Sequence, residues 1–432
     1  SRGLGDVYKR QGLYDGGHGA GLWDYWEMMC KHPRCAGGFL WVLADEGVMR
    51  TDQDGRIDNV GNYGADGIVG PHHEREGSFY TVKQIWSPVQ VMNTSLPDNF
   101  DGTFNIENRY DFTNLKDCKF KWVLKSLKGE EKILNQGEVN GTDIAPHSAG
   151  TLKINLPQNW RNADALYLTA YGKDNEELWT WDWDWKQSSE YYPFADKRGK
   201  LSTQDNDKTL QVSAGNTTLT FDKSTGLLSS VQENEKSIAF EKGPRFIAAR
   251  RGDRSMDVYY NHDDNEARSK ERIYNDISGE SKLTSFNFKS YTDSIVVTAD
   301  YFGNMRQAKW TIQSNGEILL DYAYQYDGTV ELMGVMFDYP ENQVVSKQWL
   351  GEGPYRVWQN RIHGTNFGIW ENDYNDPIPG ETFIYPEFKG YFNNWKWLSL
   401  KTTEGTINIG NVSGSKYLGV YTPVSYTHLR AH

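Results

Sequence analysis

The stretch GGFLWVLADEG, residues 37–47, decides how the first part of this 432-residue chain is interpreted. Its apolar run, residues 39–44, has no polar alternation and ends at two acidic residues, Asp45 and Glu46. Such a run is typical of a strand that is buried on both faces of a parallel sheet. It predicts one strand of a β/α barrel, with both acids at the rim where strand ends face the active site.

Helices are expected on both sides of this strand. Apolar residues recur at helical spacing over residues 22–30, ahead of Pro33, and again over residues 79–86, ahead of Pro88. Between strand and second helix, the Asp54-Gly55 pair is typical of a hairpin turn. Helix, strand, long loop and helix form one slice of a barrel, and one slice cannot cover its own strand.

Beyond Pro88 the pattern becomes that of an all-β protein. Short strand-like runs separated by Asn, Asp and Gly turns, such as DGTFNIENRYDFTNL (101–115), predict an immunoglobulin-like sandwich over residues 89–195. A polar stretch at 196–207 is expected to be a linker. Residues 201–422 then show strand after strand without helical periodicity, which predicts one large β-sandwich.

The stretch ELWTWDWDW, residues 177–185, places tryptophans at every second position of a predicted strand. Side chains two apart in a strand lie on one face, so the four indole rings should form a stripe. The stripe could be a platform for sugar rings. We favour packing against a neighbouring domain, because such stripes are usually part of a core.

Composition argues against several classes of function. The net charge of −12 argues against a general binder of nucleic acid or of anionic membranes. The sequence contains no run of 18 apolar residues, the length that a helix needs to span a bilayer. Cys30, Cys35 and Cys118 match no zinc pattern and are expected to be free, packed thiols. Aromatic residues make up 14% of the chain, which suits carbohydrate binding but also suits an all-β core.

Two barrel-like stretches carry a family resemblance. CAGGFLWVLADEGV (35–48) and GNYGADGIVGPHHEREGSFYTVKQIWSPV (61–89) resemble the end of the catalytic barrel of glycoside hydrolase family 2, specifically the large β-galactosidases. QWLGEGPYRVWQNR (348–361) is similar to a hallmark stretch of the large sandwich that ends those enzymes. The resemblance covers about residues 12–422, of which the barrel stretch is specific and the middle domain is generic.

The resemblance implies a mostly β chain with a partial (β/α)8-barrel remnant. It implies three regions in order: the C-terminal slice of the barrel at 12–88, an immunoglobulin-like sandwich at 89–195, and a galactose mutarotase-like supersandwich at 201–422. The ends of the chain, SRGLGDVYKRQ (1–11) and PVSYTHLRAH (423–432), look like translated sequencing adapters and are interpreted as non-native. The chain is therefore expected to be a C-terminal fragment of a longer bacterial protein.

Family 2 enzymes hydrolyse glycosides with retention, using one carboxylate as acid/base and a second as nucleophile. In the family the nucleophile lies in a segment of the type TEFxHGLYDGG, and GLYDGG occurs here at residues 12–17. Counting back places Gln11 at the family His and Tyr8 at the nucleophile. The acid/base belongs to an upstream strand, so this chain is expected to lack both catalytic carboxylates.

The resemblance also implies binding residues. Trp41 aligns with a family tryptophan at the galactose site, although barrel filling explains this residue equally well from the sequence alone. Asp66 stands where the classical enzymes have an Asn that contacts the sugar and Na⁺, and Tyr63 stands where an aromatic residue offers its backbone carbonyl to that ion. An Asp keeps the oxygen acceptor but removes the NH₂ donor. The complete enzyme is expected to hold Mg²⁺ or Ca²⁺ as well as Na⁺.

The expected function is removal of terminal non-reducing β-D-galactose from β-galactosides by the complete protein, with the fragment itself inactive. The expected partner is a carbohydrate substrate, and the complete enzyme could be a homo-oligomer in the periplasm or cytoplasm of a bacterium. Two alternatives stay open: another family 2 specificity, such as that of a β-glucuronidase, and a non-enzymatic carbohydrate-binding β protein.

Overall fold

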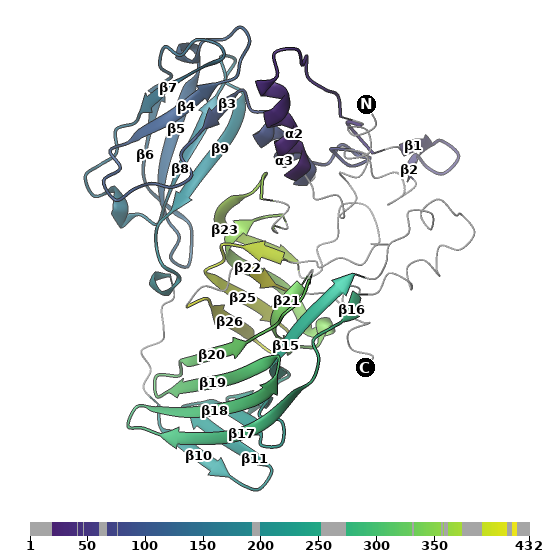
Figure 1. Ribbon diagram of the computed structural model, residues 1–432, viewed down its shortest axis with the longest axis vertical. Helices are drawn as coiled ribbons and strands as arrows, with labels where there is room; N and C mark the ends of the chain where they lie inside the picture. The colour runs from purple at the N-terminus through teal and green to yellow at the C-terminus, as the bar shows by residue number, and fades with distance from the viewer. Residues whose placement is uncertain are drawn as a thin grey trace. The chain divides into compact units, whose positions relative to one another are not determined.

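The computed structural model describes residues 20–40, 42–45, 47–59, 67–75, 77–191, 199–251, 274–330, 332–355, 357, 362–373, 391–412 and 417–420. Over these residues the chain is mostly β, which confirms the predicted fold class (Figure 1). Its contacts divide it into two compact units. The first comprises residues 1–192, 346–401 and 407–422, and the second comprises 193–345, 402–406 and 423–432.

The first unit begins with helices α2 (Ala20–Lys31) and α3 (Gly77–Ile85), which confirm the two helices expected from apolar spacing. Their buried side chains, Leu22 and Ile85, share one small core. Strands β1 (Gly47–Arg50) and β2 (Arg56–Asn59) pair as the expected hairpin. Asp54 and Gly55 both have positive φ angles, 53° and 75°, in its turn.

The apolar run at residues 39–44 does not form the expected buried strand in its described part. Phe39 is fully exposed and Leu43 is 67% exposed. Ala44 alone makes an isolated parallel bridge, with Val69. A strand that is buried on both faces needs sheet neighbours and covering layers, and the described residues supply one neighbour and partial cover at Leu40, which packs against the core of Leu22 and Ile85. Burial of this strand in a complete barrel, and the barrel slice itself, therefore stay predictions.

A two-sheet antiparallel sandwich follows the helices (Figure 1). One sheet has the order β3-β4-β7, with β3 (Val89–Val91), β4 (Thr103–Asn108) and β7 (Ser148–Lys153). The other has the order β6-β5-β8-β9, with β6 (Lys132–Asn140), β5 (Lys119–Ser126), β8 (Ala165–Tyr171) and β9 (Glu177–Asp184). Alternate residues of both sheets enter one core, as Phe104 and Phe120 do.

The tryptophan stripe lies inside this core. Trp179, Trp181 and Trp183 on β9 are 4, 9 and 6% exposed. The ring of Trp183 lies 4.9 Å from that of Phe104 on the opposing sheet, and its indole N–H donates to the Asn93 carbonyl. The stripe was expected to pack against a neighbouring domain. That prediction was wrong, because the sandwich needs this face of β9 to fill its own interior.

The first unit also contains the last strands of the chain. A four-stranded sheet has the order β23-β22-β25-β26, with β22 (Val344–Gly353), β23 (Asn366–Asp373), β25 (Trp397–Thr402) and β26 (Thr406–Gly410). Strand β24 (Tyr391–Asn393) pairs with β27 (Tyr417–Gly419). The fully buried Trp349 lies 4.0 Å from Phe392, so the two sheets share a core.

In its described residues, the second unit contains two sheets. Eight strands form the first, in the path β10-β11-β12-β13-β15-β16, with β14 paired to β13 and β21 paired to β15. They are β10 (Leu201–Asp205), β11 (Thr209–Ala214), β12 (Thr217–Asp222), β13 (Leu228–Glu233), β14 (Lys236–Ile238), β15 (Glu241–Arg251), β16 (Tyr274–Asp276) and β21 (Leu332–Asp338). The strand β10 occupies part of the stretch that was expected to be a linker.

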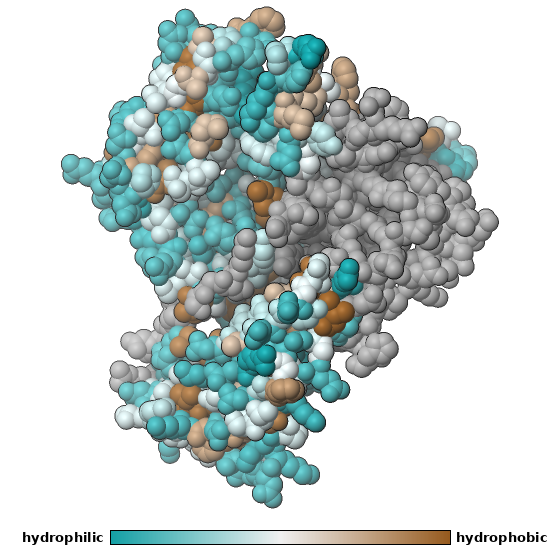
Figure 2. Space-filling view, viewed as in Figure 1, coloured by the Kyte–Doolittle hydropathy of each residue, from teal (hydrophilic) through white to brown (hydrophobic). Residues whose placement is uncertain are grey.

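Four consecutive strands form the other sheet of the second unit. They are β17 (Ser281–Ser290), β18 (Ser294–Gly303), β19 (Met305–Gln313) and β20 (Ile318–Tyr324). Phe221 of the first sheet packs against Trp310 of the second, with ring centroids 5.7 Å apart. Figure 2 shows hydrophilic side chains over most of the described surface in that view, with hydrophobic residues scattered among them.

Three other sequence expectations can be compared with the described residues. Contacts group the strands after residue 346 with the first unit, whereas residues 201–422 were expected to be one sandwich; that boundary stays a prediction. The three cysteines are free thiols; Cys118 is buried, but Cys30 and Cys35 are exposed and not packed as expected. Among the described residues, no helix is long and apolar enough to cross a membrane.

Candidate functional site

The three binding residues that the family resemblance implies, Trp41, Tyr63 and Asp66, lie outside the described residues, as does Glu46. The structure describes the residues that follow two of them, Trp41 and Asp66. Residues 42–45 follow Trp41, and residues 67–75 follow Asp66. At the expected sugar site, the structure therefore describes these two flanking segments, residues 42–45 and 67–75.

These two flanks lie side by side. The backbone N–H of Ile68 donates to the carbonyl of Val42 (3.1 Å), and that of Val69 donates to Leu43 (3.0 Å). In the other direction, the N–H of Asp45 donates to the carbonyl of Val69 (3.0 Å). The pairing is parallel, as between neighbouring strands of a β/α barrel. It brings the segments that begin directly after Trp41 and Asp66 into contact.

The Asp45 carboxylate fixes the closest point of this pairing. Its Oδ1 accepts a hydrogen bond of 2.7 Å from the backbone N–H of Gly67. A Cβ atom at Gly67 would lie 2.3 Å from the Asp45 nitrogen and 2.4 Å from the Val69 carbonyl oxygen. Only glycine allows this approach. Asp45 was a candidate acid at the barrel rim, and the structure gives its carboxylate a role in holding the Gly67 backbone.

No described group tests the implied metal chemistry. The two residues that the resemblance assigns to Na⁺ are outside the described ranges. Within the described residues, no cluster of three or more His, Cys, Asp or Glu side chains is placed to hold a metal ion.

Helix α3 is held to the segment that precedes β23. The Thr81 hydroxyl donates to the His363 carbonyl (3.0 Å), and the N–H of Gly364 donates to Gln84 Oε1 (2.6 Å). Gly364 has a φ of +86°, and a Cβ there would lie 2.5 Å from the Thr81 nitrogen. Burial lowers the pKa of the His363 imidazole, whose ring stacks on Trp23 of α2 at 4.8 Å. The neutral ring can therefore pack against indole without a buried charge.

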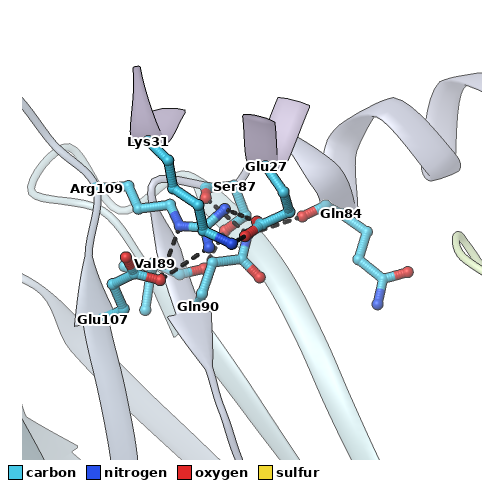
Figure 3. Close-up of polar contacts among 8 residues, drawn as sticks. All are labelled: Glu27, Lys31, Gln84, Ser87, Val89, Gln90, Glu107 and Arg109. Atoms are coloured by element: carbon cyan, nitrogen blue, oxygen red, sulfur yellow. Dashed lines mark hydrogen bonds and ion pairs between the residues drawn. The ribbon is translucent and has the colours of Figure 1, made fainter. Parts of the chain in front are cut away.

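Both helices are joined to the sandwich by a polar network around Arg109 (Figure 3). The guanidinium Nη1 lies 2.7 Å from Glu27 of α2, and Nη2 lies 2.8 Å from Glu107 of β4. Gln90 of β3 donates through Nε2 to the carbonyls of Gln84 and Ser87, which satisfies acceptors at the C-terminal end of α3. The network fixes the helices on the edge of the sandwich.

A second polar cluster lies on the other face of the tryptophan strand. Asp182 alternates with the tryptophans of β9 and points away from the sandwich core. Its Oδ2 accepts from Asn366 Nδ2 (2.6 Å), and its Oδ1 accepts from the Phe367 backbone N–H (3.2 Å). Asp184, two residues on, pairs with Lys396 (2.8 Å) and accepts from Asn394 Nδ2 (2.9 Å).

Glu352 of β22 completes this cluster. Its Oε2 accepts from the Thr365 hydroxyl (3.1 Å), and it is the register partner of Phe367 on β23. Burial and the like charge of Asp182 raise the pKa of Glu352 to about 8. Burial also raises the pKa of Asp182 to about 7, against the lowering effect of its two hydrogen bonds from Asn366 and Phe367. The two interacting carboxyls therefore titrate together, as one pair.

This cluster was not predicted from the sequence. A signal for it is present in residues 177–185, since Asp182 and Asp184 alternate with the tryptophans. A strand with indoles on one face and carboxylates on the other is typical of a strand that has a core on one side and a polar neighbour on the other. The hydrogen-bond partners of Asp182 lie 184 and 185 positions later, where no local pattern marks them.

A cavity of about 420 Å³ opens in the second unit. Residues of β10, the β17–β18 turn and Ser314 line it, and most of their side chains are polar, including Ser202, Thr203 and Asp293. None of the site residues predicted from the sequence lies there.

Curated relatives of the chain are β-galactosidases. A β-galactosidase of Priestia megaterium is 20% identical over 413 residues, 89% of this chain and 38% of that protein. A β-galactosidase of Pseudoalteromonas haloplanktis is 22% identical over 425 residues, 87% of this chain and 40% of that protein. The chain thus spans about two fifths of the length of these relatives.

A solved structure of the exo-chitosanase from Amycolatopsis orientalis aligns with 80% of this chain and 29% of its own, at 9% identity. Its TM-score of 0.20 is too low to carry an argument. Family models are more informative. Residues 104–182 match the model described as beta-galactosidase, domain 4, and residues 213–428, half of the chain, match the one described as beta galactosidase small chain. The chain therefore belongs to the beta galactosidase small chain family.

Proposed function

We propose that this chain is the C-terminal part of a retaining glycoside hydrolase that removes terminal non-reducing β-D-galactose from β-galactosides. Family membership supports the enzyme class. The observation that carries the site is the parallel pairing of residues 42–45 with residues 67–69. This pairing would bring Trp41 and Asp66 to one edge of a barrel, where an indole face and a carboxylate can contact a sugar.

In this proposal the chain supplies binding groups and no catalytic carboxylate. Retaining hydrolysis needs a nucleophilic carboxylate about 5 Å from the acid/base. Tyr8 stands at the nucleophile's position, beside Lys9 and Arg10, which provide no base at neutral pH. Asp45 is committed to the Gly67 N–H. The 432 residues alone should therefore not hydrolyse a β-galactoside.

A hybrid enzyme tests the proposal. Residues 12–422 would be joined to the upstream part of the Priestia megaterium β-galactosidase, with the TEFxH segment intact, and assayed with an aryl β-galactoside. We expect turnover by the hybrid and none by the 432-residue chain. Trp41→Ala in the hybrid should raise KM at least tenfold, whereas Phe112→Ala, at a residue 98% exposed on the sandwich, should leave KM unchanged.

Two other results would contradict the proposed specificity or the proposed active site. A hybrid that hydrolyses aryl β-glucuronides in preference to β-galactosides would place the chain in another specificity class. Turnover by the 432-residue chain alone, lost on changing Asp45, would require a different active site.

The domain organisation belongs to the same proposal. Residues 12–88 would be the last slice of the barrel, 89–195 an immunoglobulin-like sandwich, and 201–422 the large sandwich. Limited proteolysis should then cut first between residues 190 and 207. The chain passes from the second compact unit back to the first between residues 345 and 346. Early, dominant cleavage there would contradict a single large sandwich.

A further inference from the structure

The polar cluster around Asp182 has more acidic than basic groups. Three carboxylates meet there: Asp182 and Asp184 from β9, and Glu352 from β22. Two cations face them, but neither is free for the pair. Lys396 is bound to Asp184 at 2.8 Å, and Lys125 of β5, which acts on Asp182 from a distance, is bound to Glu131 at 2.6 Å.

The remaining neighbours of the pair are neutral. Asn366, Thr365 and the Phe367 N–H donate hydrogen bonds from the β23 side, and Asn394 contributes from the segment before β25. From β8, the Tyr167 hydroxyl donates to the Phe367 carbonyl at 2.6 Å and so adds no positive charge. Two negative charges, those of Asp182 and Glu352, are therefore left uncompensated, and protonation of the pair removes them.

We propose that Asp182 and Glu352 form a proton-dependent latch, the carboxyl latch, which holds β9 of the sandwich against β22 and the start of β23. In its protonated state, the pair accepts the hydrogen bonds of Thr365, Asn366 and Phe367 without an uncompensated buried charge. When both carboxyls are charged, their repulsion acts directly across this contact.

The latch is connected to helix α3 by a very short path. Asn366 and Phe367, which bind Asp182, are separated by a single residue from His363 and Gly364, which bind Thr81 and Gln84. Opening the latch therefore loosens the segment that also holds α3. The apolar contacts of Phe367 with Leu127, Ala165 and Tyr167 remain, so the expected response is local loosening and not dissociation.

The direction of the pH effect follows from linkage. The pair's pKa values are raised in the folded chain, so the folded state binds more protons than the unfolded state above about pH 4. The stability that the pair contributes is complete below that pH. It is lost as pH rises through about 7 and 8, where the folded pair releases its protons. Alkaline pH opens the latch.

Hydrogen exchange of the full chain tests the proposal. Peptides covering residues 363–373 would be compared at pH 6 and pH 9, after correction for intrinsic exchange rates. We expect protection to fall about tenfold in the native chain and less than threefold in Glu352→Gln, which cannot be charged. Asp101→Asn is the matched control, because Lys153 lowers the pKa of the exposed Asp101 to about 2, and it should behave as the native chain.

Equal loss of protection in the native chain and in Glu352→Gln would overturn the latch, as would no loss in the native chain. If Glu352→Gln does not fold, the native chain still gives an answer. Carbon-13 NMR of side-chain carboxyls should then show two groups that titrate above pH 6. Titration of every carboxyl below pH 5 would also overturn the proposal.

Discussion

Two regions of the first unit are equally rich in large apolar residues but differ in what covers them. In the sandwich, the indoles of β9 are less than 10% exposed, because an opposing sheet supplies Phe104 and its neighbours. Between residues 39 and 49, Phe39, Leu43 and Met49 are 102, 67 and 65% exposed. Apolar sequence therefore produces a core only where the chain also supplies the second layer.

The difference is one of partners and not of hydrophobicity. Strand β9 is paired over its length with β8 and faces β4 across the core. The segment at 42–45 has one partner, residues 67–69, and the structure describes no covering helix or sheet over Phe39 and Leu43. Four experiments test this difference between the two regions.

The largest loss of structure is expected when the helices are separated from the sandwich. Residues 12–88 alone should not fold, because their buried side chains, such as Ile85, pack within a very small core and Arg109 of the sandwich holds α2. The proton NMR spectrum of this peptide should lack amide dispersion. A dispersed, cooperatively melting spectrum would show that the segment supplies its own core. Residues 89–422 should instead be soluble and melt cooperatively.

Truncating one tryptophan side chain of β9 should cause the next largest loss of stability. Trp181→Ala should lower the free energy of unfolding by about 3–5 kcal/mol, since it opens a cavity in the sandwich core. Thr180→Ala, on the opposite face of the same strand, should cost about 1 kcal/mol through the loss of its hydrogen bond to Thr169. Urea unfolding measures both changes, and similar costs would mean that the two faces of β9 are not different in kind.

The ion pairs between helix and sandwich rank third. Arg109→Met should lower stability by about 2 kcal/mol, because it leaves the carboxylate of Glu27, whose side chain is only 19% exposed, with only the more distant and exposed Lys31 at 3.5 Å. Lys83→Met is the control: its pair with the half-exposed Glu177 should be worth less than about 1 kcal/mol. Equal effects would show that burial of the Arg109 pair contributes nothing beyond a surface contact.

The smallest effect is expected at the exposed run. Phe39→Ser should change the free energy of unfolding by no more than about 0.5 kcal/mol, since the side chain has no buried surface to lose. Leu22→Ala, at a residue 3% exposed in α2, should cost about 2–5 kcal/mol in the same denaturation assay. A loss above 1 kcal/mol for Phe39→Ser would mean that another surface covers this ring in solution.

Much of the local structure could be predicted from the sequence. Apolar spacing placed α2 and α3, the Asp54-Gly55 pair placed the β1–β2 hairpin, and alternation placed the strands of the sandwich. The candidate binding residues Trp41, Tyr63 and Asp66 remain predictions, although the pairing of their flanks is now described. These successes share a cause: each depends on interactions within a few residues, which a short window of sequence contains.

The sequence by itself determined that β9 has two chemically distinct faces, and it determined the family through stretches such as QWLGEGPYRVWQNR. Only the tertiary structure decided what each face meets. In the folded chain the tryptophans of β9 point into the core of their own sandwich, and Asp182 accepts a hydrogen bond from Asn366, 184 positions away. The tertiary structure also showed that the run at 39–44 is not buried by the described residues. Burial and pKa depend on neighbours that are distant in the chain, and no local pattern encodes those neighbours.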